Sequence, residues 1–209
     1  MILGSSLRYI EKSLRCLCDN LCMEIESLGI DGAWICRSNI HVDERGKFQE
    51  WFKEQAVFAK TGFDFSVAQA NLSHSKFGVV RGIHYSLAPK GQAKWVTCIS
   101  GAIQDVVLDI RTTSPTYGEH VSVNLEAGSG KAILIEPKLA HGFVALEENT
   151  IVAYLVSSPY SPSEEFEINP LDPELGIEWG LPINQLIISE KDRIAPGLAE
   201  RKSQGNIPS

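Results

Sequence analysis

Short apolar runs separated by turn residues dominate the sequence between Gly32 and Ser157, and this pattern constrains the fold more than any other feature. The runs are rich in β-branched residues and are bounded by glycine or proline, as is typical of strands and tight turns. In residues 120–126 apolar and polar side chains alternate, which indicates a sheet with one solvated face. We expect strands at residues 35–42, 47–52, 66–73, 78–85, 94–100, 102–111, 120–126, 132–136 and 151–157. Strands at such short intervals predict an all-β domain, which is a sandwich, a jelly roll or a small barrel.

Turns and short helices complete this outline. Residues 43–46 separate the first two runs, and Gly46 can take a positive φ, so we expect a β-hairpin there. Residues 49–60 are expected to pass from a strand into a short helix. After Pro159 the chain is rich in loops, and we expect a last short helix at about residues 196–202.

The N-terminal segment stands apart from the strand pattern. Its apolar residues recur at helical spacing, which predicts a short amphipathic helix at residues 7–21. These apolar positions are Leu7, Ile10, Leu14, Leu17 and Leu21. The alternative is that Met23 is the natural start, because the strand pattern begins only after it. In either case we expect an extension at residues 1–23 without chemistry, followed by a single domain at residues 24–209.

Composition and charge restrict the function classes. The chain has 209 residues, of which 44% are hydrophobic and 22% charged, so it can bury the core of one domain. Its net charge of −7 argues against a nucleic-acid surface, whereas a small anionic ligand needs only a few converging cations. No apolar run approaches the ~20 residues of a membrane-spanning helix, and the N-terminus has no clear signal-peptide pattern. We therefore expect a cytoplasmic protein that binds neither nucleic acid nor a membrane.

The five cysteines have no spacing typical of a disulfide framework, which indicates reduced thiols in the cytosol. Three of them, Cys16, Cys18 and Cys22, lie close together. No fourth ligand follows at a spacing typical of zinc, so we expect no metal there.

Residues 78–85 are the stretch in which we expect the chemistry. Strict alternation along a strand would place Arg81 and His84 on opposite faces. A β-bulge at Gly82 would bring them to one face, since an extra residue re-aims the side chains that follow it. The alternative is that His84 is a hydrogen-bonded core histidine and Arg81 a charge at the rim.

Many polar residues interrupt the apolar runs, and burying them without partners would cost ~1–3 kcal/mol each. They are Gln69, Asn71, Arg81, His84, Lys94, Asp105, Asp109 and Tyr154, with His141 in an expected loop at residues 137–143. So many polar groups on neighbouring strands predict a polar cavity lined from the inside of the sheet, where small barrels and jelly rolls hold ligands. Asp109 and Arg111 are expected to form a purely structural pair.

Several segments together match one family in order and spacing. The segments are residues 81–85 (RGIHY), 92–98 (QAKWVTC), 101–111, 114–118 (SPTYG) and 140–143 (AHGF). Over about residues 24–195 the chain resembles the dTDP-4-dehydrorhamnose 3,5-epimerases and their relatives in antibiotic-sugar pathways. The resemblance implies a double-stranded β-helix, a cupin-like jelly roll, with short flanking helices. It also implies a homodimer that uses no metal or organic cofactor.

The resemblance also implies catalytic roles that the residue types can fill. Inverting a carbon next to a ketone needs a base on one face, an acid on the other and stabilisation of the enolate. His84 matches the base, and Asp192 matches the carboxylate that orients it. Lys94 matches the cation beside the oxyanion, and Tyr154 matches the acid on the opposite face.

A further set of residues matches the positions that bind the nucleotide sugar. Tyr160 matches the aromatic residue that stacks on thymine. Lys191 stands where many relatives carry arginine, so a bidentate contact with the diphosphate is expected to be weaker. The other matches are Arg45, Phe48, Glu50, Gln69, Asn71, Arg81, His141 and Glu165.

The expected activity is epimerisation of dTDP-4-keto-6-deoxy-D-glucose at C3 and C5 without a cofactor. One alternative is a 3- or 5-epimerase that acts on a single centre, because residue identity does not report how the sugar is oriented. A metal-dependent cupin would need clustered histidines, and His84 has no second histidine two residues away. A non-catalytic module that binds sugar nucleotides would not need His84, Lys94, Tyr154 and Asp192 together.

Overall fold

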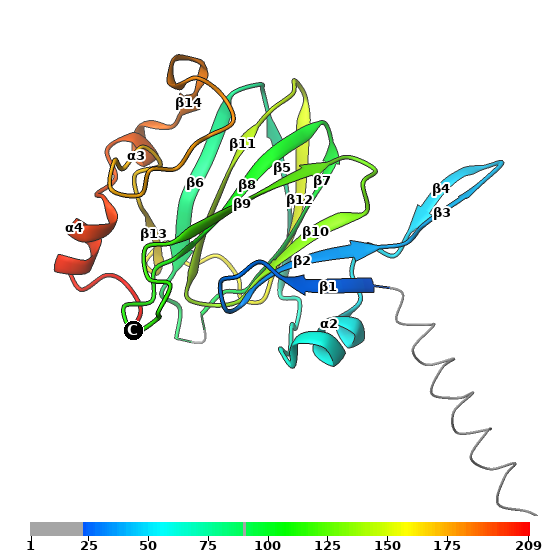
Figure 1. Ribbon diagram of the computed structural model, residues 1–209, viewed down its shortest axis with the longest axis horizontal. Coiled ribbons are helices and arrows are strands. Elements are labelled where there is room, and N and C mark those ends of the chain that lie inside the picture. The colour runs from blue at the N-terminus through cyan, green and yellow to red at the C-terminus, as the bar shows by residue number, and fades with distance from the viewer. Residues whose placement is uncertain (1–22, 90) are drawn as a thin grey trace, which may run out of the picture.

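The computed structural model describes residues 23–89 and 91–209. The helix expected at residues 7–21 and the cysteines Cys16, Cys18 and Cys22 lie outside the described residues. Two facing sheets form the body of the domain, which is a jelly roll (Figure 1). The expected all-β class is therefore confirmed.

Each sheet has six strands. The first has the order β1 (Met23–Ser27), β2 (Ala33–Ser38), β10 (Lys131–Ile135), β7 (Lys94–Ser100), β12 (Thr150–Val156) and β5 (Gln69–Ser75). The second has the order β13 (Glu165–Glu167), β6 (Val79–Ser86), β11 (Leu139–Ala145), β8 (Ala102–Asp109) and β9 (His120–Glu126), and β14 (Ile187–Ile188) also pairs with β6. All neighbours within these sheets are antiparallel except β14 and β6.

A separate hairpin and a few short helices flank the sheets. The hairpin pairs β3 (Ile40–Asp43) with β4 (Gly46–Gln49) and projects away from the body of the domain (Figure 1). The helices are α2 (Glu54–Thr61), the 3-10 helix η1 (Ile183–Gln185), α3 (Glu190–Arg193) and α4 (Leu198–Ser203). The expected hairpin turn is confirmed, and the last expected helix corresponds to α4. Among the described residues, no helix combines the length and apolar character needed to cross a membrane.

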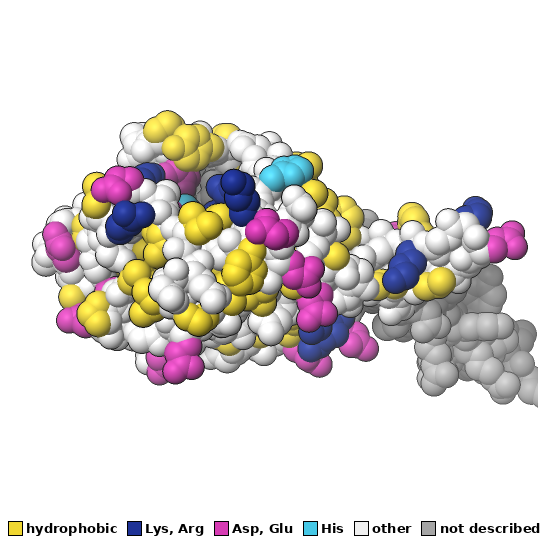
Figure 2. Space-filling view, turned by 90° about the horizontal axis from the view of Figure 1, so that it is seen from above, with side chains coloured by type: hydrophobic (Ala, Val, Ile, Leu, Met, Phe, Trp, Pro, Cys, Tyr) yellow, Lys and Arg dark blue, Asp and Glu magenta, His cyan; other side chains and the backbone are white. Residues whose placement is uncertain are grey.

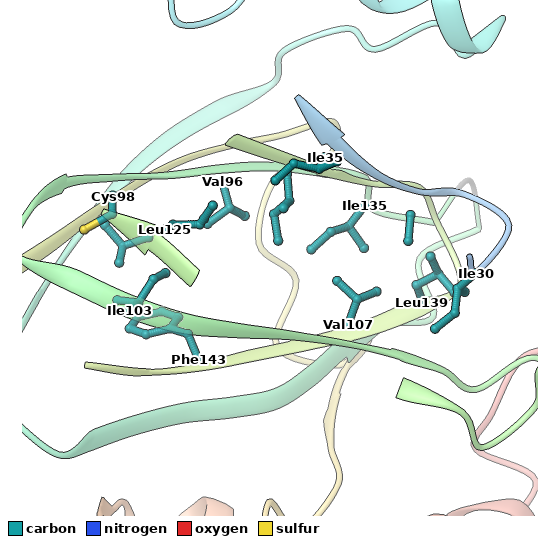
Figure 3. Close-up of a cluster of buried hydrophobic side chains, with 13 residues drawn as sticks. Ile30, Ile35, Val96, Cys98, Ile103, Val107, Leu125, Ile135, Leu139 and Phe143 are labelled. Atoms are coloured by element: carbon teal, nitrogen blue, oxygen red, sulfur yellow. The ribbon is translucent and has the colours of Figure 1, made fainter. Parts of the chain in front are cut away.

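Three clusters of buried apolar side chains hold these layers together. The first lies between the sheets, where Ile35 and Ile135 of one sheet face Val107 of the other (Figure 3). The second includes Tyr85 and packs the outer face of the second sheet against the C-terminal segment, and the third includes Trp95 and packs the first sheet against the segment around α2. Each fully buried side chain of this kind contributes about 1.5–3 kcal/mol.

Two predicted segments differ from the structure. Residues 35–42 were expected to form one strand, but the chain divides at Asn39 between β2 and the projecting hairpin. Residues 137–143 were expected to form a loop, but β11 begins at Leu139 and lies between β6 and β8. Gly142 fits this strand because β6 approaches so closely that a Cβ at position 142 would lie 3.0 Å from the carbonyl oxygen of Arg81. His141 is therefore a strand residue and not a loop residue.

The expected structural pair of Asp109 and Arg111 is confirmed. Asp109 is fully buried and accepts hydrogen bonds from Arg111 Nη2 at 2.7 Å, Ser114 Oγ at 2.6 Å and Thr116 Oγ1 at 2.7 Å. Burial alone would raise the pKa of Asp109, but these hydrogen bonds lower it to about 2. The carboxylate therefore stabilises the segment that follows β8.

Asp109→Asn should lower the free energy of unfolding by roughly 2 kcal/mol at pH 7, since one pKa unit corresponds to about 1.4 kcal/mol. Because the pKa is depressed in the folded state, this contribution is present above about pH 4 and is lost as the pH falls toward 2. Urea unfolding at pH 7 and at pH 3 should show the difference from the parent shrinking at the lower pH. Asp31→Asn is the control, because exposed Asp31 also contacts Arg111, and it should change stability little. An equal loss at both pH values would contradict this account of Asp109.

Candidate active site

A cavity of about 870 Å³ lies between the two sheets. It is lined by β5, β7 and β12 from the first sheet, by β6, β11 and β13 from the second, and by the segment that carries β14 and α3. Seen from above, the surface is hollowed between basic and acidic side chains (Figure 2). The expected site residues that line the cavity are Gln69, Asn71, Arg81, His84, Lys94, His141, Tyr154, Tyr160, Glu165, Lys191 and Asp192. The expected polar cavity is therefore present.

A bulge in β6 brings Arg81 and His84 into this cavity together. His141 of β11 is opposite His84 and Phe143 is opposite Arg81, so two residues of β6 face the single residue between them on β11. Gly82 has a φ of 126°, and a Cβ there would lie 2.5 Å from the Cα of Gly142. Only glycine fits such a position, and the bulge expected from the sequence is confirmed.

His84 and Asp192 form a close pair in the cavity wall. The Nε2 atom of His84 lies 2.7 Å from Oδ1 of Asp192, which is almost completely buried. Ser189 holds this carboxylate in place, because its hydroxyl donates to Oδ2 at 2.8 Å and accepts from the Asp192 backbone N–H at 3.1 Å. Burial alone would raise the pKa of Asp192, but the hydrogen bonds with His84 and Ser189 hold it below its usual value. The pair therefore combines an imidazole with a carboxylate that stays ionised.

Lys94 and His141 line the cavity, and the buried Asp105 contacts His141. His141 Nε2 lies 2.7 Å from Asp105 Oδ2, and Asp105 Oδ1 has no hydrogen-bond partner within the described part of the chain. Burial lowers the pKa of Lys94, while Glu165 and Asp105 oppose that shift. Burial raises the pKa of Asp105, while His141 and Lys94 oppose that shift. A lysine and a carboxylate that share a dry site each favour the charged form of the other.

Tyr154 reaches the cavity from the sheet opposite His84. It lies on β12, between Asn71 of β5 and Val96 of β7, whereas His84 lies on β6 of the second sheet. Burial raises the pKa of the Tyr154 phenol, and Arg81 acts in the opposite direction. The phenol is therefore protonated at neutral pH and can donate a proton from the first sheet.

The remaining polar groups lie toward the cavity mouth. Gln69 donates to Asn71 Oδ1 at 2.7 Å and accepts from the backbone N–H of Tyr160 at 3.3 Å. Arg81 donates to Ser75 Oγ at 3.1 Å and to the His74 carbonyl at 3.0 Å. Lys191 Nζ lies 3.0 Å from Glu167 Oε2. These contacts orient the polar side chains, and the exposed ring of Tyr160 lies at the rim.

Arg45, Phe48 and Glu50 do not line the cavity of their own chain. Arg45 lies at the tip of the hairpin, where its side chain is 85% exposed and pairs with Asp43. Phe48 is 66% exposed on β4, and Glu50 lies 3.8 Å from Lys53 near the base of the hairpin. The structure of one chain thus separates these three expected binding residues from the other eleven.

The described residues contain no group of three or more His, Cys, Asp or Glu side chains that could hold a metal ion. His84 and His141 are opposite one another on β6 and β11, but each is paired with its own carboxylate.

Comparison with known proteins identifies the family to which the chain belongs. A family model described as dTDP-4-dehydrorhamnose 3,5-epimerase matches residues 27–200. The chain belongs to the dTDP-4-dehydrorhamnose 3,5-epimerase family. A dTDP-4-dehydrorhamnose 3,5-epimerase from Streptomyces griseus is 44% identical over 181 residues, which are 87% of this chain and 90% of that protein.

Solved structures of epimerases have the same fold. A 4-keto-6-deoxy sugar epimerase from the novobiocin biosynthetic gene cluster of Streptomyces spheroides has a TM-score of 0.86 at 41% identity, covering 90% of this chain and 93% of that chain. A 3'-monoepimerase from Streptomyces bikiniensis, solved with dTDP-quinovose, has a TM-score of 0.83 at 40% identity, covering 88% and 92%. The cupin-like jelly roll implied by the resemblance to the dTDP-4-dehydrorhamnose 3,5-epimerases is thus confirmed.

The cavity of this family member also contains residues that the sequence analysis did not place in the site. They are Gln92, Glu167 and Ser189, with Asp105 directly behind His141. The sequence indicated that Asp105 is a polar residue within a strand. It did not indicate that His141 is the partner of Asp105, because His141 was expected to lie in a loop. Glu167 lies on a strand of three residues, which is too short to give a periodic signal.

Proposed function

We propose that this protein epimerises dTDP-4-keto-6-deoxy-D-glucose at C3 and C5, next to the C4 ketone. One observation carries the proposal: His84, which is paired with Asp192, and the Tyr154 phenol enter one cavity from opposite sheets, and the buried Lys94 also lines this cavity. Epimerisation needs a base and an acid on opposite faces of the sugar, and this arrangement supplies both.

The proposed reaction begins at His84. Its neutral imidazole removes the proton from the carbon next to the ketone, and the electrons of the broken C–H bond move onto the C4 oxygen. Asp192 stabilises the imidazolium that forms, and Lys94 stabilises the enolate oxygen. Tyr154 then donates its proton to the opposite face of the same carbon, which inverts it. Both side chains recover their protonation states by exchange with solvent.

The cavity mouth is suited to the nucleotide part of the substrate. The exposed ring of Tyr160 offers a surface on which thymine can stack, and Lys191 lies nearby to meet the diphosphate. Arg81 adds a second cation, and its guanidinium is already oriented by Ser75 and His74. We propose that Gln69, Asn71, His141 and Glu165 complete the contacts with the sugar and its diphosphate.

Solvent exchange tests the proposed activity. The protein is incubated with dTDP-4-keto-6-deoxy-D-glucose in D2O, and NMR follows deuterium uptake and inversion at C3 and C5. We expect both centres to exchange and invert. Exchange at C3 alone would favour the second candidate, an epimerase of a single centre, since the family includes the 3'-monoepimerase described above. Binding without exchange at either carbon would favour a non-catalytic module.

We also propose that the protein works as a cytoplasmic homodimer. The two cysteines that lie within the described residues, Cys36 and Cys98, are free and buried, which fits a reducing compartment. An isolated two-stranded hairpin is marginally stable, and this one exposes Val42 and Phe48. We infer that the hairpin packs on a second copy and carries Arg45, Phe48 and Glu50 to the partner's cavity.

Light scattering should therefore give the mass of a dimer. A mixed-dimer experiment tests the exchange of hairpins: His84→Asn and Arg45→Ala chains, each impaired alone, are unfolded and refolded together. In a mixed dimer one cavity has both wild-type parts, so random pairing should restore about a quarter of the parent activity. An active monomer, or a mixture no better than its components, would contradict the dimer proposal.

We expect no loss of activity in EDTA, because the proposed acid, base and oxyanion stabiliser are all side chains of this protein. The assay compares initial epimerisation rates before and after dialysis against EDTA. A loss that one divalent metal restores would instead favour a metal-dependent cupin.

A further inference from the structure

Three charged side chains, Lys191, Glu167 and Arg201, form two linked ion pairs at the mouth of the cavity. Lys191 of α3 lies 3.0 Å from one carboxylate oxygen of Glu167, and Arg201 of α4 lies 3.6 Å from the other. Glu167 is on β13, directly opposite His84 of β6. The carboxylate is therefore shared between a cation at the cavity and a cation behind it.

The two cations differ in how firmly they are held. The side chain of Arg201 is 11% exposed, its Nε donates to the Glu167 carbonyl at 2.7 Å, and its guanidinium lies 5.5 Å from the ring centre of Phe166. The side chain of Lys191 is 59% exposed, and its flexible stem ends in a compact ammonium group. Lys191 can therefore leave Glu167, whereas Arg201 stays.

The balance of charge along the cavity makes this difference important for binding. The formally charged residues that line the cavity are the cations Arg81, Lys94 and Lys191 and the carboxylates Glu165, Glu167 and Asp192. With neutral histidines these charges cancel, so the diphosphate is attracted by the individual cations close to it and not by a net charge of the cavity. A cation that turns from a carboxylate toward the diphosphate therefore strengthens the binding.

We propose that Glu167 competes with the substrate's diphosphate for Lys191, and that Lys191 changes partner when the nucleotide sugar binds. Arg201 keeps Glu167 paired after the change, so no buried carboxylate is left alone. Glu167 thereby weakens the binding of any nucleotide that cannot draw Lys191 away. This inference rests on the proposed function, because that function places a diphosphate beside Lys191.

Calorimetric titration with dTDP measures the competition. Glu167→Gln keeps the shape of the side chain but removes its charge, and it should tighten dTDP binding about two- to fivefold, as expected for a partly exposed ion pair. Lys191→Met should weaken binding, and in the Lys191→Met background Glu167→Gln should have no effect. Glu190→Gln is the matched control, because it removes the same charge from the helix that carries Lys191, but its carboxylate pairs with Arg193.

A second variant guards against an effect on folding. Glu167→Asp keeps a charge beside Arg201 but shortens the reach toward Lys191, so it should also tighten dTDP binding. If Glu167→Gln has a lowered melting temperature, the affinity of Glu167→Asp is the result that tests the proposal. Unchanged or weaker dTDP binding by Glu167→Gln and Glu167→Asp would contradict the proposed competition. An equal gain in affinity from Glu167→Gln in the Lys191→Met background would also contradict it, as would an equal gain from Glu190→Gln. If the parent protein does not bind dTDP at all, the proposed function fails together with this inference. If the parent binds dTDP and the variants bind equally, only the inference fails.

Discussion

Replacing His84 with asparagine should lower deuterium exchange at both C3 and C5 by about 100-fold or more, since loss of a general base typically costs that much. Asparagine keeps a polar side chain at this position but does not reach as far as the Nε2 atom that contacts Asp192, and its amide is not a base, so the proton acceptor is lost. NMR in D2O measures the exchange rates directly, and an unchanged affinity for dTDP checks that the site is intact.

Asp192→Asn gives a graded comparison for the same assay. The Ser189 cap on α3 can persist with asparagine, but the negative charge that stabilises the imidazolium is removed. Exchange should therefore fall, although less than in His84→Asn, because the base itself remains. An Asp192→Asn loss larger than the His84→Asn loss would assign the base to the carboxylate instead of the imidazole.

The strand pattern and the cavity could be predicted from the sequence because both depend on local signals. Apolar runs bounded by glycine predicted most strands, and the spacing of Arg81 and His84 required a bulge at Gly82 to place both side chains on one face. The polar residues within apolar strands converged because a buried polar group must find a partner.

Three features of the site depend on packing and could not be predicted in this way. The break at Asn39 separates the hairpin from β2. No sequence pattern at Asn39 predicts that Arg45 and Phe48 project away from the cavity of their own chain. The residues around His141 contain small side chains and a glycine, which suggest a loop until the close approach of β6 explains them. The partners of Asp105 and Glu167 then follow from strand register, which the sequence alone does not provide.

Tyr154→Phe should separate deuterium uptake from inversion, two events that are coupled in the parent enzyme. Phenylalanine keeps the ring in place on β12 but removes the hydroxyl, and His84 on the opposite sheet is unaffected. The enolate should still form, and water or His84 should return a deuteron to it. Inversion should therefore fall by about 100-fold or more, while deuterium uptake at the first carbon attacked falls much less.

The ratio of uptake to inversion is the decisive measurement, because a general loss of substrate binding would lower both rates equally. Tyr160→Phe is the matched control: it removes a hydroxyl from an exposed ring at the rim, and the ratio should stay at the parent value. If Tyr154→Phe inverts both carbons at the parent rate, the proton comes from another group, and the assignment of acid and base to opposite sheets is wrong. A parallel loss of uptake and inversion would instead place Tyr154 in substrate binding, since removal of the acid alone leaves the first proton transfer to His84 possible.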